Sequence, residues 1–197
     1  QHNGYLRIAT TTGSWGDSLE NQVYILDEAL QIVGEITGIA KGETIQSVRY
    51  IGDYGYVVTF RQTDPLFVID FKDMKNPKIV GELKIPGFSS YLHPFNGYLV
   101  GIGRDGDDNG ATDALKISLF DISDPTNPKE IDRFIVQNAY AETGHKTVMD
   151  CSEKDILGFI YYDRRTSDSQ LATLRIKEGK INLILKLGAS GVCGVLV

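Results

Sequence analysis

A short motif that returns along the chain constrains the fold more than any other feature of this sequence. An apolar segment ending in Asp70 is followed by the element Asp73–Lys78, which reads Asp-x-x-Asn-Pro-Lys. The same order returns fifty-one residues later, where Asp121 precedes Asp124–Lys129. Repetition at this spacing is typical of folds assembled from one supersecondary unit. The apolar segment occurs at Val23–Asp27, Leu66–Asp70, Ile117–Asp121 and, in a weaker form, Leu171–Arg175.

A second series of apolar segments lies between these copies, and each member has the form of a hairpin. Ser90–His93 and Tyr98–Ile102 flank Asn96-Gly97, a strong signal for a two-residue turn because both residues tolerate positive φ. Similar pairs of short strands are predicted at 47–60 and 145–160. One repeat therefore holds four strands in about 42 to 54 residues, which is the size of a β-propeller blade.

The order of these strands predicts one all-β domain, a β-propeller fragment of about four four-stranded antiparallel blades. It occupies residues 1–187 and begins at the second strand of its first blade, so we expect that blade to be incomplete. Residues 188–197 form a tail, which is either a closing strand or a segment foreign to the fold. The predicted blades are residues 4–37, 45–84, 88–135 and 143–186.

Composition and charge argue against two classes of partner. A net charge of −6 and a pI near 5.1 disfavour nucleic acid and anionic membrane surfaces, which select clustered Lys and Arg. No apolar run approaches the roughly 20 residues of a membrane-spanning helix, so we expect no membrane insertion. Cys151 and Cys193 are too few for a disulfide framework, which leaves a single bridge or two buried free thiols.

Long contiguous stretches of the repeat resemble one known family. The matching stretches are 56–70, 81–94, 101–105 and 115–125, and the resemblance extends over residues 4–187. The family consists of prokaryotic secreted proteins with a C-terminal β-propeller domain that is distantly related to WD-type repeats. The resemblance implies an exported protein of the cell envelope, and it implies no particular activity because the function of that family is not established.

The sharpest local motif is an acidic loop between the second and third strands of the third predicted blade. It fits the pattern D-x-D-x-[DN]-G-x-x-D and resembles the calcium hairpins of integrin-type propellers, in which alternate side-chain oxygens converge on one cation. The EF-hand form is incomplete, because Lys116 stands at its twelfth position. The alternative is a solvated acidic hairpin, which is common on acidic proteins. The predicted calcium ligands are Asp105, Asp107, Asn109 and Asp113.

We predict no binding site at two further motifs. Gly101, Gly103 and Gly106 fit the pattern G-x-G-x-x-G, but no helix is expected to follow and the acidic residues beside them would repel a pyrophosphate. The pair Arg164-Arg165, in the loop before the third strand of the fourth blade, is typical of an ordinary solvated turn.

The inner strands of a propeller line its central channel, so polar residues on them are candidates for ligand contacts. A pair of histidines there could bind a metal or a ligand, although a hydrogen-bonded structural role is the more frequent use of such residues. An arginine there could bind an anion, although pairing with a nearby Asp is more common. The channel candidates are His93, His145 and Arg49.

The sequence contains no recognisable catalytic constellation, and its regular blades favour binding over chemistry. We expect a non-enzymatic exported binding or scaffold module whose partner is a protein or an envelope polymer. The alternative is an envelope enzyme, a hydrolase or lyase, with its site at the mouth of the channel. Because an incomplete propeller leaves open blade edges, we also expect self-association through those edges.

Overall fold

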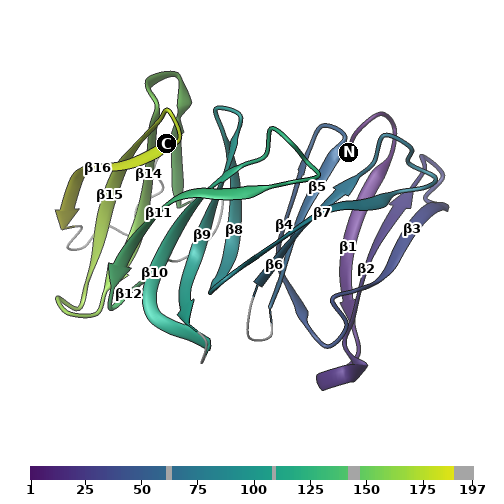
Figure 1. Cartoon of the computed structure of the whole chain (residues 1–197), viewed down its shortest axis with the longest axis horizontal. Helices are drawn as coiled ribbons and strands as arrows, with labels where there is room; N and C mark the ends of the chain where they lie inside the picture. The colour runs from purple at the N-terminus through teal and green to yellow at the C-terminus, as the bar shows by residue number, and fades with distance from the viewer. Residues whose placement is uncertain (61–63, 108–109, 142–146, 189–197) are drawn as a thin grey trace. The chain divides into compact units, whose positions relative to one another are not determined.

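The computed structural model describes residues 1–60, 64–107, 110–141 and 147–188 of the chain. These residues form antiparallel β-sheets with two single-turn 3-10 helices (Figure 1), the all-β class that the repeat predicts. The chain divides into two compact units. The first contains Gln1–Ile85 and Asp124–Pro128, and the second contains Pro86–Ser123 and Lys129–Val197.

The first unit begins with a three-stranded sheet in the order β1-β2-β3. Its middle strand buries Val23 and Ile25 completely, because alternate residues of a strand point to opposite faces and these two face the second sheet of the unit. The elements are β1 (Leu6–Thr12), η1 (Gly16–Ser18), β2 (Glu20–Leu26) and β3 (Ile32–Ile39).

The second sheet of this unit has four strands in the order β4-β5-β6-β7. Its central strands are buried on both faces, which is why they read in the sequence as nearly continuous apolar runs. Val57 and Ile69 join Val23 and Ile25 in one hydrophobic cluster that holds the two sheets together. The strands are β4 (Thr44–Ile51), β5 (Tyr54–Phe60), β6 (Asp64–Asp70) and β7 (Lys78–Ile85).

The second unit contains another four-stranded sheet, in the order β11-β10-β9-β8. Asn96 and Gly97 have φ values of 47° and 83°, so the predicted two-residue hairpin joins β8 to β9. The strands are β8 (Phe88–Phe95), β9 (Tyr98–Asp107), β10 (Gly110–Asp121) and β11 (Lys129–Gln137).

The last sheet has five strands rather than four. Its strand β14 pairs with β15 on one side and, on the other, with two short strands, β12 and β13, in succession. The predicted start of the fourth blade at residue 143, Cys193 and all but the first residue of the tail lie outside the described residues. The elements are β12 (Ala139–Ala141), β13 (Val148–Cys151), η2 (Ser152–Lys154), β14 (Ile156–Asp163), β15 (Asp168–Lys177) and β16 (Lys180–Gly188).

The repeated Asp-x-x-Asn-Pro-Lys element packs on the outer strand of the preceding sheet. A Cβ atom on Gly34 of β3 would overlap the carbonyl oxygen of Met74, and a Cβ atom on Gly81 of β7 would overlap the carbonyl oxygen of Pro125. Met74 and Pro125 both belong to copies of the element. The glycines are therefore required for close approach of two backbones.

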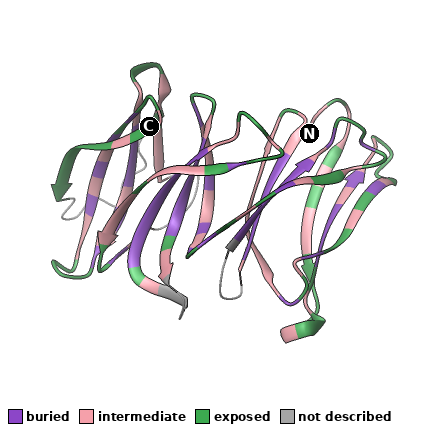
Figure 2. Ribbon diagram, in the orientation of Figure 1, coloured by how far each residue is buried: buried purple, intermediate pink, exposed green. Residues whose placement is uncertain are grey.

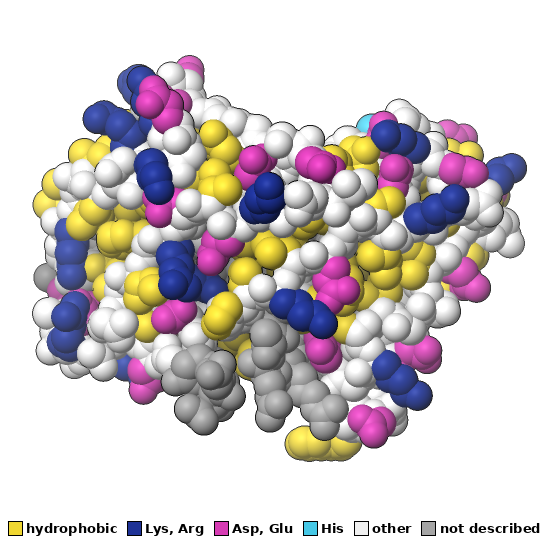
Figure 3. Space-filling model, viewed as in Figure 1, with side chains coloured by type: hydrophobic (Ala, Val, Ile, Leu, Met, Phe, Trp, Pro, Cys, Tyr) yellow, Lys and Arg dark blue, Asp and Glu magenta, His cyan; other side chains and the backbone are white. Residues whose placement is uncertain are grey.

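Buried residues run along the middle strands of each sheet, whereas exposed residues gather on outer strands and turns (Figure 2). Lys and Arg side chains are interspersed with Asp and Glu on the face drawn in Figure 3. Within the part of the chain that the structure describes, no helix has the length and apolar character needed to cross a membrane.

Candidate functional site

His93 is the predicted channel residue that the structure places in a defined polar network. It lies on β8, the first strand of its sheet, and its side chain is 13% exposed. Its Nε2 lies 2.9 Å from Oδ2 of Asp150 on β13, and the hydroxyl of Tyr91 lies 3.3 Å from its Nδ1. Because both ring nitrogens have hydrogen-bonding partners, His93 offers no free nitrogen to a metal or a substrate.

The same network holds Asp150 as a carboxylate. Burial acts to raise the pKa of Asp150, but hydrogen bonds from His93 and from the backbone N–H of Ser152 outweigh it and lower that pKa. Beside this pair, Nδ2 of Asn96 donates to the carbonyl of Ser152 at 2.8 Å and to Oδ1 of Asp155 at 3.0 Å. Polar contacts therefore join β8 and the β8–β9 turn to β13 and to the η2 turn of the last sheet.

Arg49 occupies a comparable place in the first unit. It lies opposite Tyr56, the third residue of β5, just as His93 lies opposite Val100, the third residue of β9. Its side chain is half-buried. The third channel candidate, His145, lies outside the described residues.

The predicted calcium loop extends the hairpin of β9 and β10, in which Asp107 pairs with Gly110. The exposed carboxylate of Asp113 accepts a hydrogen bond from Nη1 of Arg164 at 2.8 Å, a partner that would compete with a cation. The side chain of Asp107 and all of Asn109 lie outside the described residues. Among the residues that are described, no group of three or more His, Cys, Asp or Glu side chains is placed to hold a metal ion.

Two glycines of the G-x-G-x-x-G pattern, Gly101 and Gly103, allow close packing of β9. A Cβ atom on Gly103 would overlap the carbonyl oxygen of Phe88, and one on Gly101 would overlap the hydroxyl of Ser89. The pairing of β8 with β9 shifts register between Ser89 and Tyr91. Small residues thus allow the two strands to approach closely at this irregularity.

A buried carboxylate lies at the end of β14. Asp163 is 1% exposed, and it accepts hydrogen bonds from Nε and Nη2 of Arg165 at 3.1 and 3.0 Å. Nζ of Lys186, from β16, lies 3.4 Å from the same carboxylate. The hydrogen bonds from Arg165 lower the pKa of Asp163 well below its usual range in spite of burial. Arg165 is therefore half of a partly buried ion pair, and not only part of a solvated turn.

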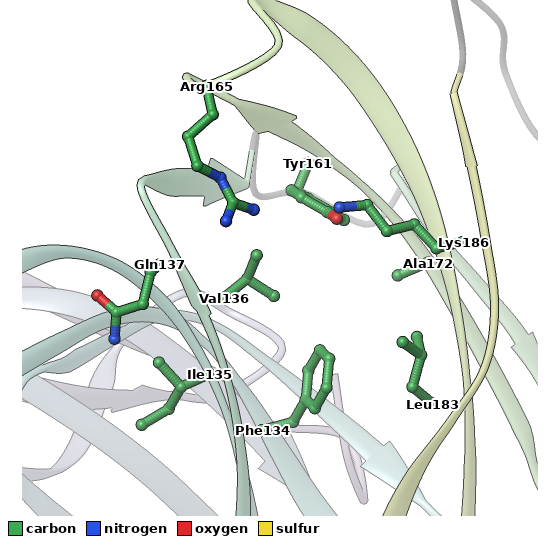
Figure 4. A pocket seen from close by; sticks show the side chains of 9 residues that line it. All are labelled: Phe134, Ile135, Val136, Gln137, Tyr161, Arg165, Ala172, Leu183 and Lys186. Carbon is green, nitrogen blue, oxygen red and sulfur yellow. The ribbon is translucent and has the colours of Figure 1, made fainter.

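A cavity of about 240 Å³ opens beside this ion pair (Figure 4). Apolar side chains from β11, β15 and β16 form its walls, and the side chains of Arg165 and Lys186 lie at one end near Tyr161. Basic groups at the end of an apolar cavity can orient a small ligand that carries a negative charge.

Each antiparallel sheet holds strands that are consecutive in sequence, and within each unit two sheets pack face to face. This architecture agrees with the comparison to known families. The beta propeller domain model matches residues 1–185. The chain belongs to this family. The propeller domain thus includes the His93–Asp150 network, the acidic loop and the cavity wall on β11.

Two relatives of this propeller domain are uncharacterised proteins of archaea. The protein from Methanocaldococcus jannaschii is 56% identical over 137 residues, which is 68% of this chain and 21% of the relative. The protein from Archaeoglobus fulgidus is 52% identical over 143 residues, which is 72% of this chain and 22% of the relative. The chain spans about a fifth of the length of these curated relatives.

Sequence reasoning missed two acidic residues that organise this propeller domain. Asp150 is 57 residues from its partner His93, and no local pattern links them. Asp163 stands two residues before Arg165, which is a local signal, but Lys186 reaches it from another strand. Only the packing of one sheet on the next and the order of strands within the last sheet bring these groups together.

Proposed function

We propose that this propeller domain is a non-enzymatic binding or scaffold module, and that its partner is a protein that packs on uncovered apolar sheet faces. The outward face of the last sheet carries the proposal. There Ile160, Leu171 and Leu187 stand in one row across β14, β15 and β16, and Leu187 is 50% exposed. Contiguous apolar surface of this kind marks interaction sites more often than scattered exposed leucines do.

The register of the strands separates this face from the core. Leu185 lies opposite Thr173 in the neighbouring row and is 43% exposed. Phe159 and Leu174, which point to the other face of the same sheet, are 1% and 0% exposed. Among the described residues, one face of the sheet is therefore the core of the unit, and its other face carries the exposed leucines.

The first unit presents a similar face on its three-stranded sheet. Leu6, Leu26 and Ile32 form one row across β1, β2 and β3. Leu6 is 38% exposed and Ile32 is 59% exposed, whereas Val23 and Ile25 on the opposite face are fully buried. Each unit thus has one terminal sheet with an apolar outward face.

A second copy of this chain is the partner that these faces fit best. Within each unit two antiparallel sheets already pack face to face through apolar side chains, so a sheet of the same kind is complementary to the uncovered faces. A second copy supplies such sheets, and its association would remove the exposed leucines from water.

Two substitutions on the outward face test the proposal. We expect Leu185→Lys combined with Leu187→Lys to weaken self-association in sedimentation velocity by at least tenfold, because the charges would have to be desolvated. Leu30→Lys is the matched control, since Leu30 is 65% exposed in a turn outside both faces. Equal association of the double variant and the control would exclude the last sheet as the docking face.

We further propose that the parent protein is exported to the cell envelope, where the loop from Asp105 to Asp113 binds calcium. The support for export is the resemblance of the repeat to secreted proteins, and the support for calcium is the spacing of the acidic residues. Protease accessibility of the full-length protein on intact cells tests the location. Complete protection there, with digestion after lysis, would contradict export.

The alternative of an envelope hydrolase or lyase gains no support from the described residues. Of its channel candidates, His93 has both ring nitrogens within hydrogen-bonding distance of Tyr91 and Asp150, and His145 lies outside the described residues. A general base must lie within hydrogen-bond reach of the proton that it abstracts, and both ring nitrogens of His93 are directed at partners within the chain. Hydrolysis of model esters, peptides or glycosides at rates lost on His93→Ala would reverse this conclusion.

A further inference from the structure

The cavity of about 240 Å³ in the second unit lies between β11, the outer strand of one sheet, and strands β14 to β16 of the next. Figure 4 shows Phe134 and Leu183 at one end of it, Val136 between the ends, and Arg165 and Lys186 at the other end. Its volume is below the ~300–1,000 Å³ of pockets for drug-sized ligands, so it suits a metabolite of about ten non-hydrogen atoms.

The two cations at the polar end are not equivalent. Arg165 is tied to Asp163 by two side-chain hydrogen bonds of 3.0 and 3.1 Å. Lys186 is tied to the same carboxylate less closely, because its Nζ lies 3.4 Å from Oδ2 of Asp163. A hydrogen bond with the hydroxyl of Tyr161 raises the pKa of Lys186, so its ammonium group stays protonated at neutral pH. An ammonium group has three donors, and Lys186 can offer one to a ligand.

The charges at this end leave one net positive charge. Arg165 and Lys186 contribute two positive charges, and the buried carboxylate of Asp163 cancels one of them. A ligand with a single negative charge would balance this net positive charge, whereas a dianion such as a phosphate monoester would be repelled by Asp163. The apolar walls disfavour sugars and other strongly hydrated ligands, whose hydroxyl groups would lose their hydrogen bonds.

We propose that this cavity binds small monocarboxylates with an apolar body, with the carboxylate beside Lys186 and Arg165 and the body between Phe134 and Leu183. The site is independent of the proposed docking face. Leu183 and Lys186 line the cavity, whereas Leu185 and Leu187 pair with Thr173 and Leu171 on the outward face.

Phenylacetate and its neutral amide, phenylacetamide, form a matched pair of probes for the cavity. Each has an apolar ring of suitable size, and only phenylacetate carries the charge. We expect phenylacetate to shift the amide resonances of β11 and β16 in a saturable manner, with a Kd of about 1 mM or lower. Phenylacetamide should bind at least tenfold more weakly, and inorganic phosphate should cause no saturable shift.

Three variants separate the cavity from nonspecific binding. Lys186→Met retains the length of the side chain and should weaken phenylacetate binding at least fivefold, with little effect on phenylacetamide. Leu183→Trp fills the cavity and should abolish binding of both probes. Lys180→Met is the control on the same strand, because Lys180 faces Asp132 at 3.9 Å outside the cavity, and it should bind phenylacetate as the unmodified chain does.

Several results would overturn the proposal. The absence of saturable shifts with 20 mM phenylacetate, or equal affinities for the acid and the amide, would show that the cavity does not select a carboxylate. Equal loss in Lys186→Met and Lys180→Met would show that only overall charge matters. If Leu183→Trp unfolds the sheet, Lys186→Met with its control still decides the role of the cation.

Discussion

The carboxylate of Asp132 on β11 accepts a hydrogen bond from the backbone N–H of Ile181 on β16, with 2.8 Å between Oδ2 and N. Asp132 stands fifty-one residues after Gly81, at the place where the earlier copies of the repeat have glycine. The fourth copy lacks the Asn-Pro element, and its hairpin turns tightly at Glu178-Gly179 instead. On β11, the side chain of Asp132 thus makes the contact that a packed loop makes at Gly81 on β7.

Removing this side chain should loosen the contact between the two outer strands. We expect Asp132→Ala to lower the free energy of unfolding by about 1–2 kcal/mol, because the N–H of Ile181 loses its acceptor. Asp132→Asn keeps an acceptor oxygen and should lose less than half as much. Urea unfolding of both variants checks this, and equal losses would show that the charge of Asp132, not its hydrogen bond, stabilises the contact.

The close approach at Gly81 predicts a large effect of one methyl group. Gly81→Ala should destabilise the chain by about 1–3 kcal/mol, because the new Cβ overlaps the carbonyl oxygen of Pro125. Gly188→Ala on another outer strand is the control, since its nearest atoms lie at 3.8 Å or more. Similar thermal midpoints for the two variants would contradict the packing of the loop on β7.

The pair His93–Asp150 predicts a pH dependence. Asp150→Asn should lower the free energy of unfolding at pH 7 by about 1 kcal/mol, after discounting a charged hydrogen bond for solvent screening. The pKa of Asp150 is lowered from its usual 3.8 on folding. The stabilisation is therefore fully present above about pH 4 and is lost as the pH falls through the lower folded value. Urea unfolding of both proteins at pH 7 and pH 2.5 should show the difference shrinking in acid, and an unchanged difference would contradict this assignment.

The acidic loop predicts a response to calcium that Arg164 opposes. We expect millimolar calcium to raise the thermal midpoint by a few degrees relative to magnesium or a chelator, because a ligand that binds the folded state stabilises it. Arg164→Gln should enlarge this rise by freeing Asp113 from its ion pair, whereas Asp107→Ala should abolish it. Identical midpoints under all three conditions would leave the loop a solvated hairpin.

The fold class could be predicted from sequence because its signals are local. Apolar segments bounded by Gly, Asn, Asp and Pro mark strands, and Asn96-Gly97 marks a hairpin whose geometry the structure confirms. The fifth strand of the last sheet could not be predicted in this way. β12 has only three residues, Ala139–Ala141, and it forms by pairing with Tyr161–Asp163, which lie 20 to 24 positions later in the chain.

The candidate site was less predictable, because its partners come from different strands. His93 was identified by its place on a first strand, but Asp150 has no sequence signal that connects the two. The cavity exists because β11 and β16 lie near each other. The hydrogen bond between Asp132 and Ile181 joins these two strands in the structure, and no pattern in the sequence connects them. Periodicity assigns side chains to faces, but it does not state which faces meet.

Sedimentation equilibrium of the unmodified chain over a hundredfold range of concentration measures directly whether the outward faces dock on a second copy. We expect a mass that rises with concentration from 21.8 kDa toward twice that value, and a smaller rise for Leu185→Lys combined with Leu187→Lys. A mass of 21.8 kDa at every concentration would show that the outward faces do not dock on a second copy.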